Sequence, residues 1–216
     1  MKWAAIIFPG SNNDADSLAA LRNALGADVE YVWHSETSLY GFDAIFIGGE
    51  ATYGNYLRAG ALAARSDITP ALLKAAADGV PIIGAGNGFH FLTEIGLLPG
   101  GFKKNKNLKF VCKFTEIKIE NNNTIFSNLY EHGESVRFPI ANGAGNYHAD
   151  ETTLAELKST NRIIFSYTDN PTGSAKNIAG IINENGNVLG ILPQPERAVE
   201  EILGSNDGKK FFRSIK

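Results

Sequence analysis

The stretch 81–90 constrains the fold of this chain more than any other segment. It reads Pro-Ile-Ile-Gly-Ala-Gly-Asn-Gly-Phe-His, a short apolar run, then closely spaced glycines, then a segment compatible with a helix. This order predicts a buried strand, a tight turn and a helix, the frame in which many enzymes present a nucleophilic side chain at a strained turn. The residue at the turn is Gly86, which has no side chain. We therefore expect the frame of a nucleophilic site without its nucleophile.

Length and charge narrow the class of protein. The 216 residues suit one compact domain, which we place at residues 1–216, and they suffice to bury a sizeable core. Hydrophobic residues make up 44% and charged residues 20%, as in soluble globular proteins. The 20 Lys and Arg nearly balance the 23 Asp and Glu. This balance argues against nucleic acid or a membrane as a partner attracted by net charge.

Cysteine and histidine usage limits the site chemistry and the compartment. Cys112 is the only cysteine, so an intrachain disulfide is excluded and a reducing cytoplasm is the expected location. The N-terminus lacks a signal-peptide pattern, and no apolar run approaches the roughly 18 residues of a membrane span. We expect Cys112 to pack in the core. His34, His132 and His148 lack metal-ligand spacing, so no metal site is expected.

Strand and helix patterns alternate over the first hundred residues. Continuous apolar runs predict strands covered on both faces, and apolar residues at helical spacing predict helices between them. Strands are expected at 3–8, 29–33, 44–47 and 82–83, and helices at 14–25, 59–64, 70–78 and 87–95. Such alternation predicts an α/β domain with a mostly parallel central sheet and helices on both faces.

The second half of the chain has a different texture. Its strands alternate apolar and polar residues, which favours antiparallel strands added to the sheet. We expect strands at 110–119, 135–139, 162–167, 178–182 and 188–192, a hairpin turn over 183–187, and helices near 196–203 and 207–214. Ligands of open α/β sheets bind beyond the carboxyl ends of the strands. The loops at 9–11, 48–50 and 84–86 are therefore expected to meet in one crevice.

Several segments resemble a known family. The turn Gly84-x-Gly86-Asn87-Gly88-Phe89 resembles the elbow of class I glutamine amidotransferases, whose motif has Cys at the Gly86 position. Further segments resemble, more narrowly, the glutaminase subunits of phosphoribosylformylglycinamidine synthase, and together they cover essentially the whole chain. These segments are 8–12, 53–61, 96–100, 108–112, 177–181 and 195–200. The resemblance implies the flavodoxin-like sandwich of this family.

The resemblance also implies an activity and partners. Family members hydrolyse glutamine to glutamate and ammonia, and the ammonia passes to a large ATP-dependent synthetase that amidates formylglycinamide ribonucleotide in purine biosynthesis. A large synthetase subunit and a small bridging subunit are the partners implied. No cofactor is implied for this chain, since ATP and Mg²⁺ belong to the synthetase. The hydrolysis requires a Cys thiolate, a His that activates it and a Glu that orients the His.

The sequence departs from the family pattern at these catalytic positions. Gly86 stands at the position of the nucleophile and Gln194 at that of the activating His, whereas the acid is retained as Glu196. An amide is no general base near neutral pH, although Gln194 is able to hydrogen-bond Glu196. Glu196 is either a remnant of the triad or an acid at a helix N-terminus, where the helix dipole favours it.

The surrounding pocket is altered as well. The family's oxyanion segment Pro-Gly-Gly-Phe reads Gly-Gly-Glu-Ala at 48–51, which puts Gly49 and Glu50 at the pocket. A charged Glu50 would oppose an oxyanion. The family segment Ala-His-Gly-Glu-Gly-Asn reads Ala-Asn-Gly-Ala-Gly-Asn at 141–146, so Asn142 and Ala144 are also pocket positions. A further family Cys, near the turn after the first strand, is here Asn13.

The helix after the turn supplies two more candidates. Asn87 follows Gly86 directly, and His90 replaces a family Gln one helical turn after the nucleophile position. His90 is either a packing residue or one half of an acid–base couple with Glu50, if the fold brings them together.

Two classes of function follow. The first is a subunit of the phosphoribosylformylglycinamidine synthase complex whose glutaminase site is inactive. In that case Gly86→Cys with Gln194→His is expected to restore part of the hydrolysis. The alternative is a repurposed enzyme that uses Glu50, His90 and Glu196 in the same pocket, or a non-catalytic or engineered binding scaffold.

Overall fold

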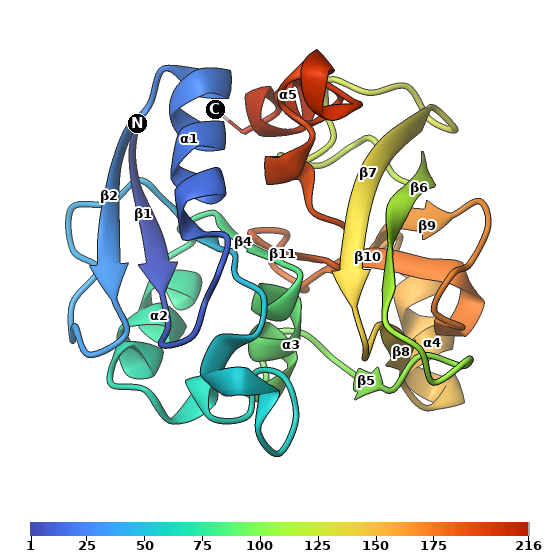
Figure 1. The fold of residues 1–216 in the computed structure, drawn as a ribbon, viewed down its shortest axis with the longest axis horizontal. Coiled ribbons are helices and arrows are strands. Elements are labelled where there is room, and N and C mark those ends of the chain that lie inside the picture. Colours follow the sequence, from blue (N-terminus) through green and yellow to red (C-terminus); the bar gives the residue numbers. More distant parts are fainter. Residues whose placement is uncertain (216) are drawn as a thin grey trace.

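A computed structural model describes residues 1–215 as an α/β fold around one large sheet (Figure 1). Within these residues nine strands pair in the order β2-β1-β3-β4-β11-β10-β9-β6-β7. The first five of this order run parallel: β2 (Asp28–Trp33), β1 (Lys2–Ile7), β3 (Ala44–Ile47), β4 (Ile82–Ala85) and β11 (Val188–Ile191). The others pair antiparallel: β10 (Ile178–Ile182), β9 (Ile163–Tyr167), β6 (Val111–Ile119) and β7 (Ser135–Asn142).

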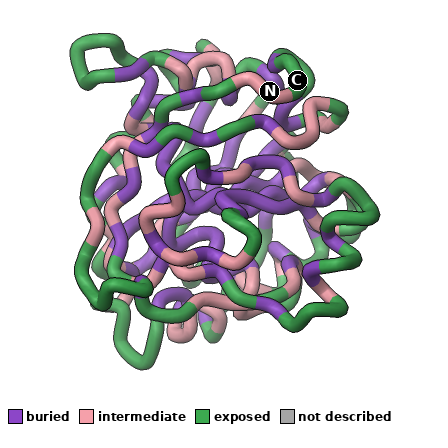
Figure 2. The backbone as a smooth tube through the Cα atoms, turned by 90° about the vertical axis from the view of Figure 1, so that its right-hand side faces the viewer, coloured by how far each residue is buried: buried purple, intermediate pink, exposed green. Residues whose placement is uncertain are grey.

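Burial follows the two sequence textures. Every residue of β3, β4 and β11 is buried, as both faces of a parallel sheet require. Strand β7 instead alternates exposed or half-buried residues with buried ones. The tube in Figure 2 shows the buried segments running through the interior and the exposed ones at the loops. The expected α/β class with added antiparallel strands is therefore confirmed.

Helices cover both faces of the central strands. Helices α1 (Asp14–Leu25) and α5 (Gly208–Arg213) pack on each other on one side of the sheet, and α3 (Asn87–Glu94) packs on β4 and β11 on the other (Figure 1). Helix α1 ends at Gly26, whose φ of 60° is left-handed. The fold also contains α2 (Ile68–Ala77), α4 (Glu151–Ser159) and a small sheet of β5 (Gly101–Lys103) with β8 (Asn146–His148).

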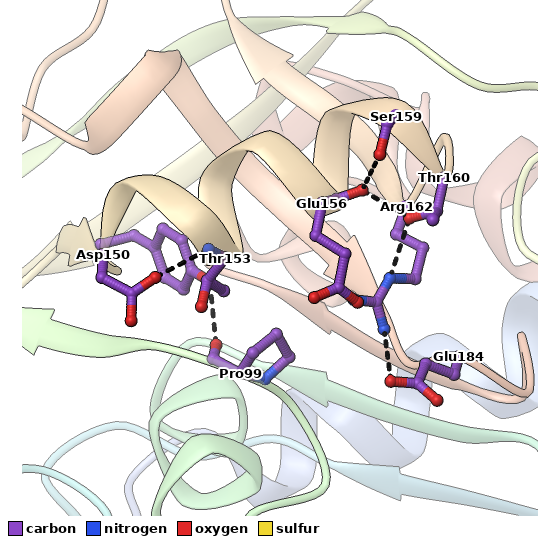
Figure 3. A network of polar contacts seen from close by, with 9 residues as sticks. Pro99, Asp150, Thr153, Glu156, Ser159, Thr160, Arg162 and Glu184 are labelled. Carbon is purple, nitrogen blue, oxygen red and sulfur yellow. Dashed lines mark hydrogen bonds and ion pairs between the residues drawn. The ribbon is translucent and has the colours of Figure 1, made fainter.

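Helix α4 was not predicted, and a polar network holds it in place (Figure 3). Asp150 caps its first turn by accepting a hydrogen bond from the Thr153 N–H at 2.7 Å. The buried Arg162 beyond its C-terminus donates to Glu156 at 2.7 Å and lies 3.6 Å from Glu184 in the β10–β11 hairpin. This guanidinium therefore links α4, β9 and the hairpin.

Two predicted helices are not formed. The segment 59–64 contains only the start of a short 3₁₀ helix, Ala63–Arg65, because Gly60 has a left-handed φ of 81° and lies against α3. The segment 196–203 forms two three-residue 3₁₀ helices, Pro195–Arg197 and Glu201–Leu203, with Glu200 extended between them. At Gly60 close packing overrides the local helical pattern, whereas the structure gives no packing reason for the extended Glu200.

The prediction for Cys112 was wrong as well. Its side chain is exposed on β6. Across residues 1–215, no helix combines the length and the apolar character needed to cross a membrane.

Candidate functional site

The predicted strand, turn and helix form around Gly86. Strand β4 ends at Ala85, α3 begins at Asn87, and Gly86 between them has φ 54° and ψ −119°. This left-handed φ favours glycine. A Cβ atom added at Gly88 would overlap the Ile47 carbonyl oxygen, so α3 lies directly against β3. The backbone from β4 through Gly86 to α3 therefore has the shape of a nucleophile elbow.

Three loops meet at the carboxyl ends of β1, β3 and β4. The Tyr53 N–H donates to the Pro9 carbonyl at 2.6 Å, and Ser11 Oγ lies 2.8 Å from the position of a Cβ atom at Gly49. The loop after β3 in turn reaches the elbow, because Gly49 O accepts from the Asn87 N–H at 3.2 Å. The three loops thus lie together, as expected for one crevice.

The carboxyl group of Glu50 fills the space in front of Gly86. A Cβ atom at Gly86 would lie 2.6 Å from Glu50 Oε1 and 3.7 Å from Gln194 Nε2. Gln194 Nε2 donates a hydrogen bond to the same Glu50 oxygen at 2.7 Å. Positions 86 and 194 are therefore close enough for a nucleophile and its base, but Glu50 occupies the place of the nucleophile's side chain. From this geometry we expect that replacing positions 86 and 194 alone does not restore hydrolysis, in contrast to the expectation from the sequence.

Glu196 is hydrogen-bonded by Asn13 rather than by Gln194. It is 2% exposed, and Asn13 Nδ2 donates to its Oε1 at 3.0 Å. The hydrogen bond that Gln194 is able to make to Glu196 is absent among the described residues, because the Gln194 amide donates to Glu50. Within residues 1–215, Gln194 Oε1 and Glu196 Oε2 are buried without a hydrogen-bond partner. Glu196 also lies in a three-residue 3₁₀ helix rather than at the start of an α-helix.

Burial changes the charge of both acids. Desolvation, followed by the neighbouring charge of Glu196, raises the pKa of Glu50 to about 8. Desolvation also raises the pKa of Glu196 to about 7. Glu50 is therefore mostly uncharged at neutral pH, contrary to the expectation of a negative charge at the oxyanion segment.

These raised pKa values predict a pH-dependent stability. Above pH 4.5 the folded protein keeps protons on Glu50 and Glu196 that the unfolded chain has released. The contribution of these two acids to the stability of the fold is therefore complete below pH 4.5. It is lost as the pH rises through about 7 for Glu196 and about 8 for Glu50. The free energy of unfolding is expected to fall by up to about 1.4 kcal/mol per pH unit for one such group. Urea unfolding between pH 5 and 9 measures it, and Glu50→Gln is expected to flatten the profile. Equal profiles for both proteins would contradict the assignment.

Three backbone N–H groups near the elbow are already engaged. The Asn87 N–H, which follows the nucleophile position, donates to Gly49 O. The side-chain oxygen of Asn87, oriented as an acceptor, receives the N–H groups of Ala51 and Thr52 at 3.1 and 3.2 Å. These N–H groups are thus directed at oxygen atoms of the protein rather than at a bound oxyanion.

His90 packs as an aromatic residue. Its ring stacks on Phe102 with centroids 4.0 Å apart, and full burial lowers its pKa to about 3. His90 and Glu50 both line a cavity of about 460 Å³, but none of the described hydrogen bonds or ion pairs joins them. The geometry therefore does not form the acid–base couple considered above.

The remaining candidates border the same cavity. Asn87, Asn142 and Ala144 line it together with Glu50 and His90. The side-chain oxygen and nitrogen of Asn142 are buried without a hydrogen-bond partner in the described part of the chain. Gly49 lies in the loop after β3, next to Glu50, and its carbonyl contacts the elbow.

Sequence reasoning gave no role to two residues of this site. Asn13 binds Glu196, and its only signal was its alignment with a family cysteine. Phe102 stacks on His90 from strand β5, a short element that carried no recognisable pattern.

Comparison with known proteins identifies the family. The CobB/CobQ-like glutamine amidotransferase domain matches residues 1–211. A chain of the PurLQS structure from Thermotoga maritima is 42% identical with a TM-score of 0.92, over 99% of this chain and 96% of that one.

More distant structures share the fold alone. One is a glutamine amidotransferase from Thermotoga maritima (13% identity, TM-score 0.57, covering 92% of this chain and 77% of that one). The glutaminase domain of Trypanosoma brucei CTPS is another (14% identity, TM-score 0.63, covering 99% and 93%). The domain match over residues 1–211 and the 42% identical chain show that this chain belongs to the CobB/CobQ-like glutamine amidotransferases and is a PurQ-like class I member of that family.

Proposed function

We propose that this chain is a glutaminase-inactive, PurQ-like subunit that works in the cytoplasm as part of a phosphoribosylformylglycinamidine synthase complex. Its partners are a large ATP-dependent synthetase and a small bridging subunit. The 42% identity to a chain of PurLQS over nearly the full length supports the assembly. The Glu50 carboxyl in front of Gly86 carries the proposal that the site is inactive.

The loss of activity does not rest on the missing thiol alone. Gln194 is no base, and its amide is held by Glu50 at 2.7 Å. The N–H group after the elbow donates to Gly49 O. The nucleophile and the base that acyl chemistry requires are therefore absent. The N–H group that would serve as an oxyanion donor is engaged by a carbonyl oxygen. Free ammonia supplies the nitrogen for amidation in this proposal, and the chain supports the synthetase by binding it.

Glutamate release tests this proposal. The purified chain is assayed with glutamine, alone and with the synthetase, ATP and the ribonucleotide, and complex formation is followed by size-exclusion chromatography. We expect a complex, no glutamate above background, and ribonucleotide amidation that depends on added ammonium. Glutamine turnover by the wild-type chain would contradict the inactive site. Absence of a complex would contradict the role in the assembly.

One observation favours a second candidate, a repurposed enzyme. Glu50 has a raised pKa and lines an open cavity of about 460 Å³, as a general acid would. This candidate predicts that Glu50→Gln abolishes an activity while the protein stays folded. The first proposal predicts that Glu50→Gln leaves complex formation and ammonium-dependent amidation unchanged. His90 is not needed in either case, because its ring is buried against Phe102.

A further inference from the structure

Exposed apolar side chains gather at the mouth of the cavity above Glu50. Tyr56, Leu57, Leu108 and Phe110 are 74%, 84%, 78% and 66% exposed, and the last three line the cavity. We call these four residues the mouth patch. Single exposed apolar residues are ordinary in soluble proteins, whereas a group of them commonly marks an interaction surface. Aromatic residues such as Tyr56 and Phe110 are enriched in protein interfaces.

The backbone holds two of these residues in an unfavourable conformation. Leu57 has φ 64° and Leu108 has φ 57°, both in the left-handed region that disfavours residues other than glycine. Burial does not offset this cost, because both side chains are exposed to solvent. Strained positions of this kind concentrate at functional sites.

A lysine-rich segment borders the mouth patch. Residues 101–113 contain five lysines and no Asp or Glu, although the whole chain has a net charge of −3. Four of these lysines are exposed beside the patch, and we call them the basic collar: Lys103, Lys104, Lys106 and Lys109. Lys104 and Lys109 line the cavity itself. The nearby Arg58 is already paired with Glu94 at 2.6 Å.

We propose that the mouth patch and the basic collar form the docking surface for a protein whose contact face has an apolar centre ringed by carboxylates. Apolar burial supplies affinity at the centre of such an interface, and charge complementarity around it supplies specificity and rate. The inference rests on the proposed function, with the large synthetase as the partner. Because the patch borders the cavity, docking covers the altered pocket.

Variants of the patch test the apolar centre. The dissociation constant for the synthetase is measured with the full-length wild-type chain and with Leu57→Asp or Leu108→Asp. Each change is expected to weaken binding at least about tenfold, as for a central interface residue. The matched control is Ile202→Asp, since Ile202 is 90% exposed outside the patch. We expect it to bind as the wild type does.

A further variant separates docking from folding. Leu108→Gly removes the side chain and suits the left-handed backbone, so its thermal midpoint is expected to be unchanged or higher while the complex weakens. If Leu108→Gly raises the thermal midpoint but binds the synthetase as the wild type does, Leu108 only strains the backbone and has no role in docking.

Charge reversal tests the basic collar. Lys104→Glu with Lys109→Glu is expected to weaken the complex about tenfold or more at low salt, with a smaller difference at high salt because the attraction is screened. Lys158→Glu with Lys176→Glu, a double reversal at exposed lysines outside the collar, is the matched control. If the control variant loses binding to the same extent, the effect comes from the overall charge, and the basic collar is not the docking surface.

The reactivity of the Cys112 thiol reports directly on whether the synthetase covers this surface. Cys112 is exposed and follows Phe110 by two residues, so its alkylation rate by a maleimide is expected to fall when the synthetase binds. If the wild-type chain forms the complex but Cys112 stays reactive and the patch variants bind normally, the docking surface is wrong and the proposed function stands. If the wild-type chain forms no complex, the proposed function itself fails, and this surface with it.

Discussion

Glutamine hydrolysis is expected only when three positions change together, Gly86→Cys, Gln194→His and Glu50→Gly. The double change at 86 and 194 places the new Cβ atom 2.6 Å from Glu50 Oε1, closer than real Cβ contacts allow. The cysteine or the carboxyl must then move, and the new His faces an acid instead of a thiol. Removing the Glu50 side chain opens this space.

Glutamate release by the purified double and triple variants measures the effect. We expect the triple variant to exceed the double variant at least about a hundredfold, the factor that a positioned base commonly contributes. Circular dichroism and the thermal midpoint control for folding. Equal activity of the folded double and triple variants would show that Glu50 does not obstruct the nucleophile position.

Gly88→Ala is expected to destabilise the fold by about 3 kcal/mol, near the upper end for overpacking. Its Cβ atom would overlap the carbonyl oxygen of Ile47, a backbone group fixed within the sheet. Helix α3 must then move away from β3, and the elbow moves with it. Urea unfolding measures the change. Gly101→Ala is the control, since a Cβ atom there meets nothing within 4 Å; similar midpoints for the two variants would contradict the close packing.

Elements with a strong local signal were predicted accurately. Helix α1 begins and ends where expected, because its apolar stripe stops at Gly26. Strand β3 also has the predicted bounds, since a continuous apolar run defines a buried parallel strand. Helix α4 was missed although Asp150 and Thr153 form a capping pair, because its apolar residues are few. The helix expected over 59–64 failed because Gly60 packs against α3, a contact between distant segments.

The site was predictable in composition but not in arrangement. The resemblance located positions 86, 194 and 196 because the framework around them is intact. The hydrogen bond from Gln194 to Glu50 joins residues that are 144 positions apart in the sequence, and nothing in the local sequence indicates it. The protonation of Glu50 likewise follows from burial, which appears only when the loop is folded over the elbow.

The pairing of Glu50 with Gln194 also bears on how this chain can evolve. A Cys at position 86 meets the Glu50 carboxyl, a Gly at position 50 leaves the buried Gln194 amide without its acceptor, and a His at position 194 has no thiol to activate. Each of these changes alone is therefore expected to be neutral or harmful, and its benefit depends on the other two. Under the proposed inactive site, no path of single substitutions through these three positions gains glutamine hydrolysis at its first step.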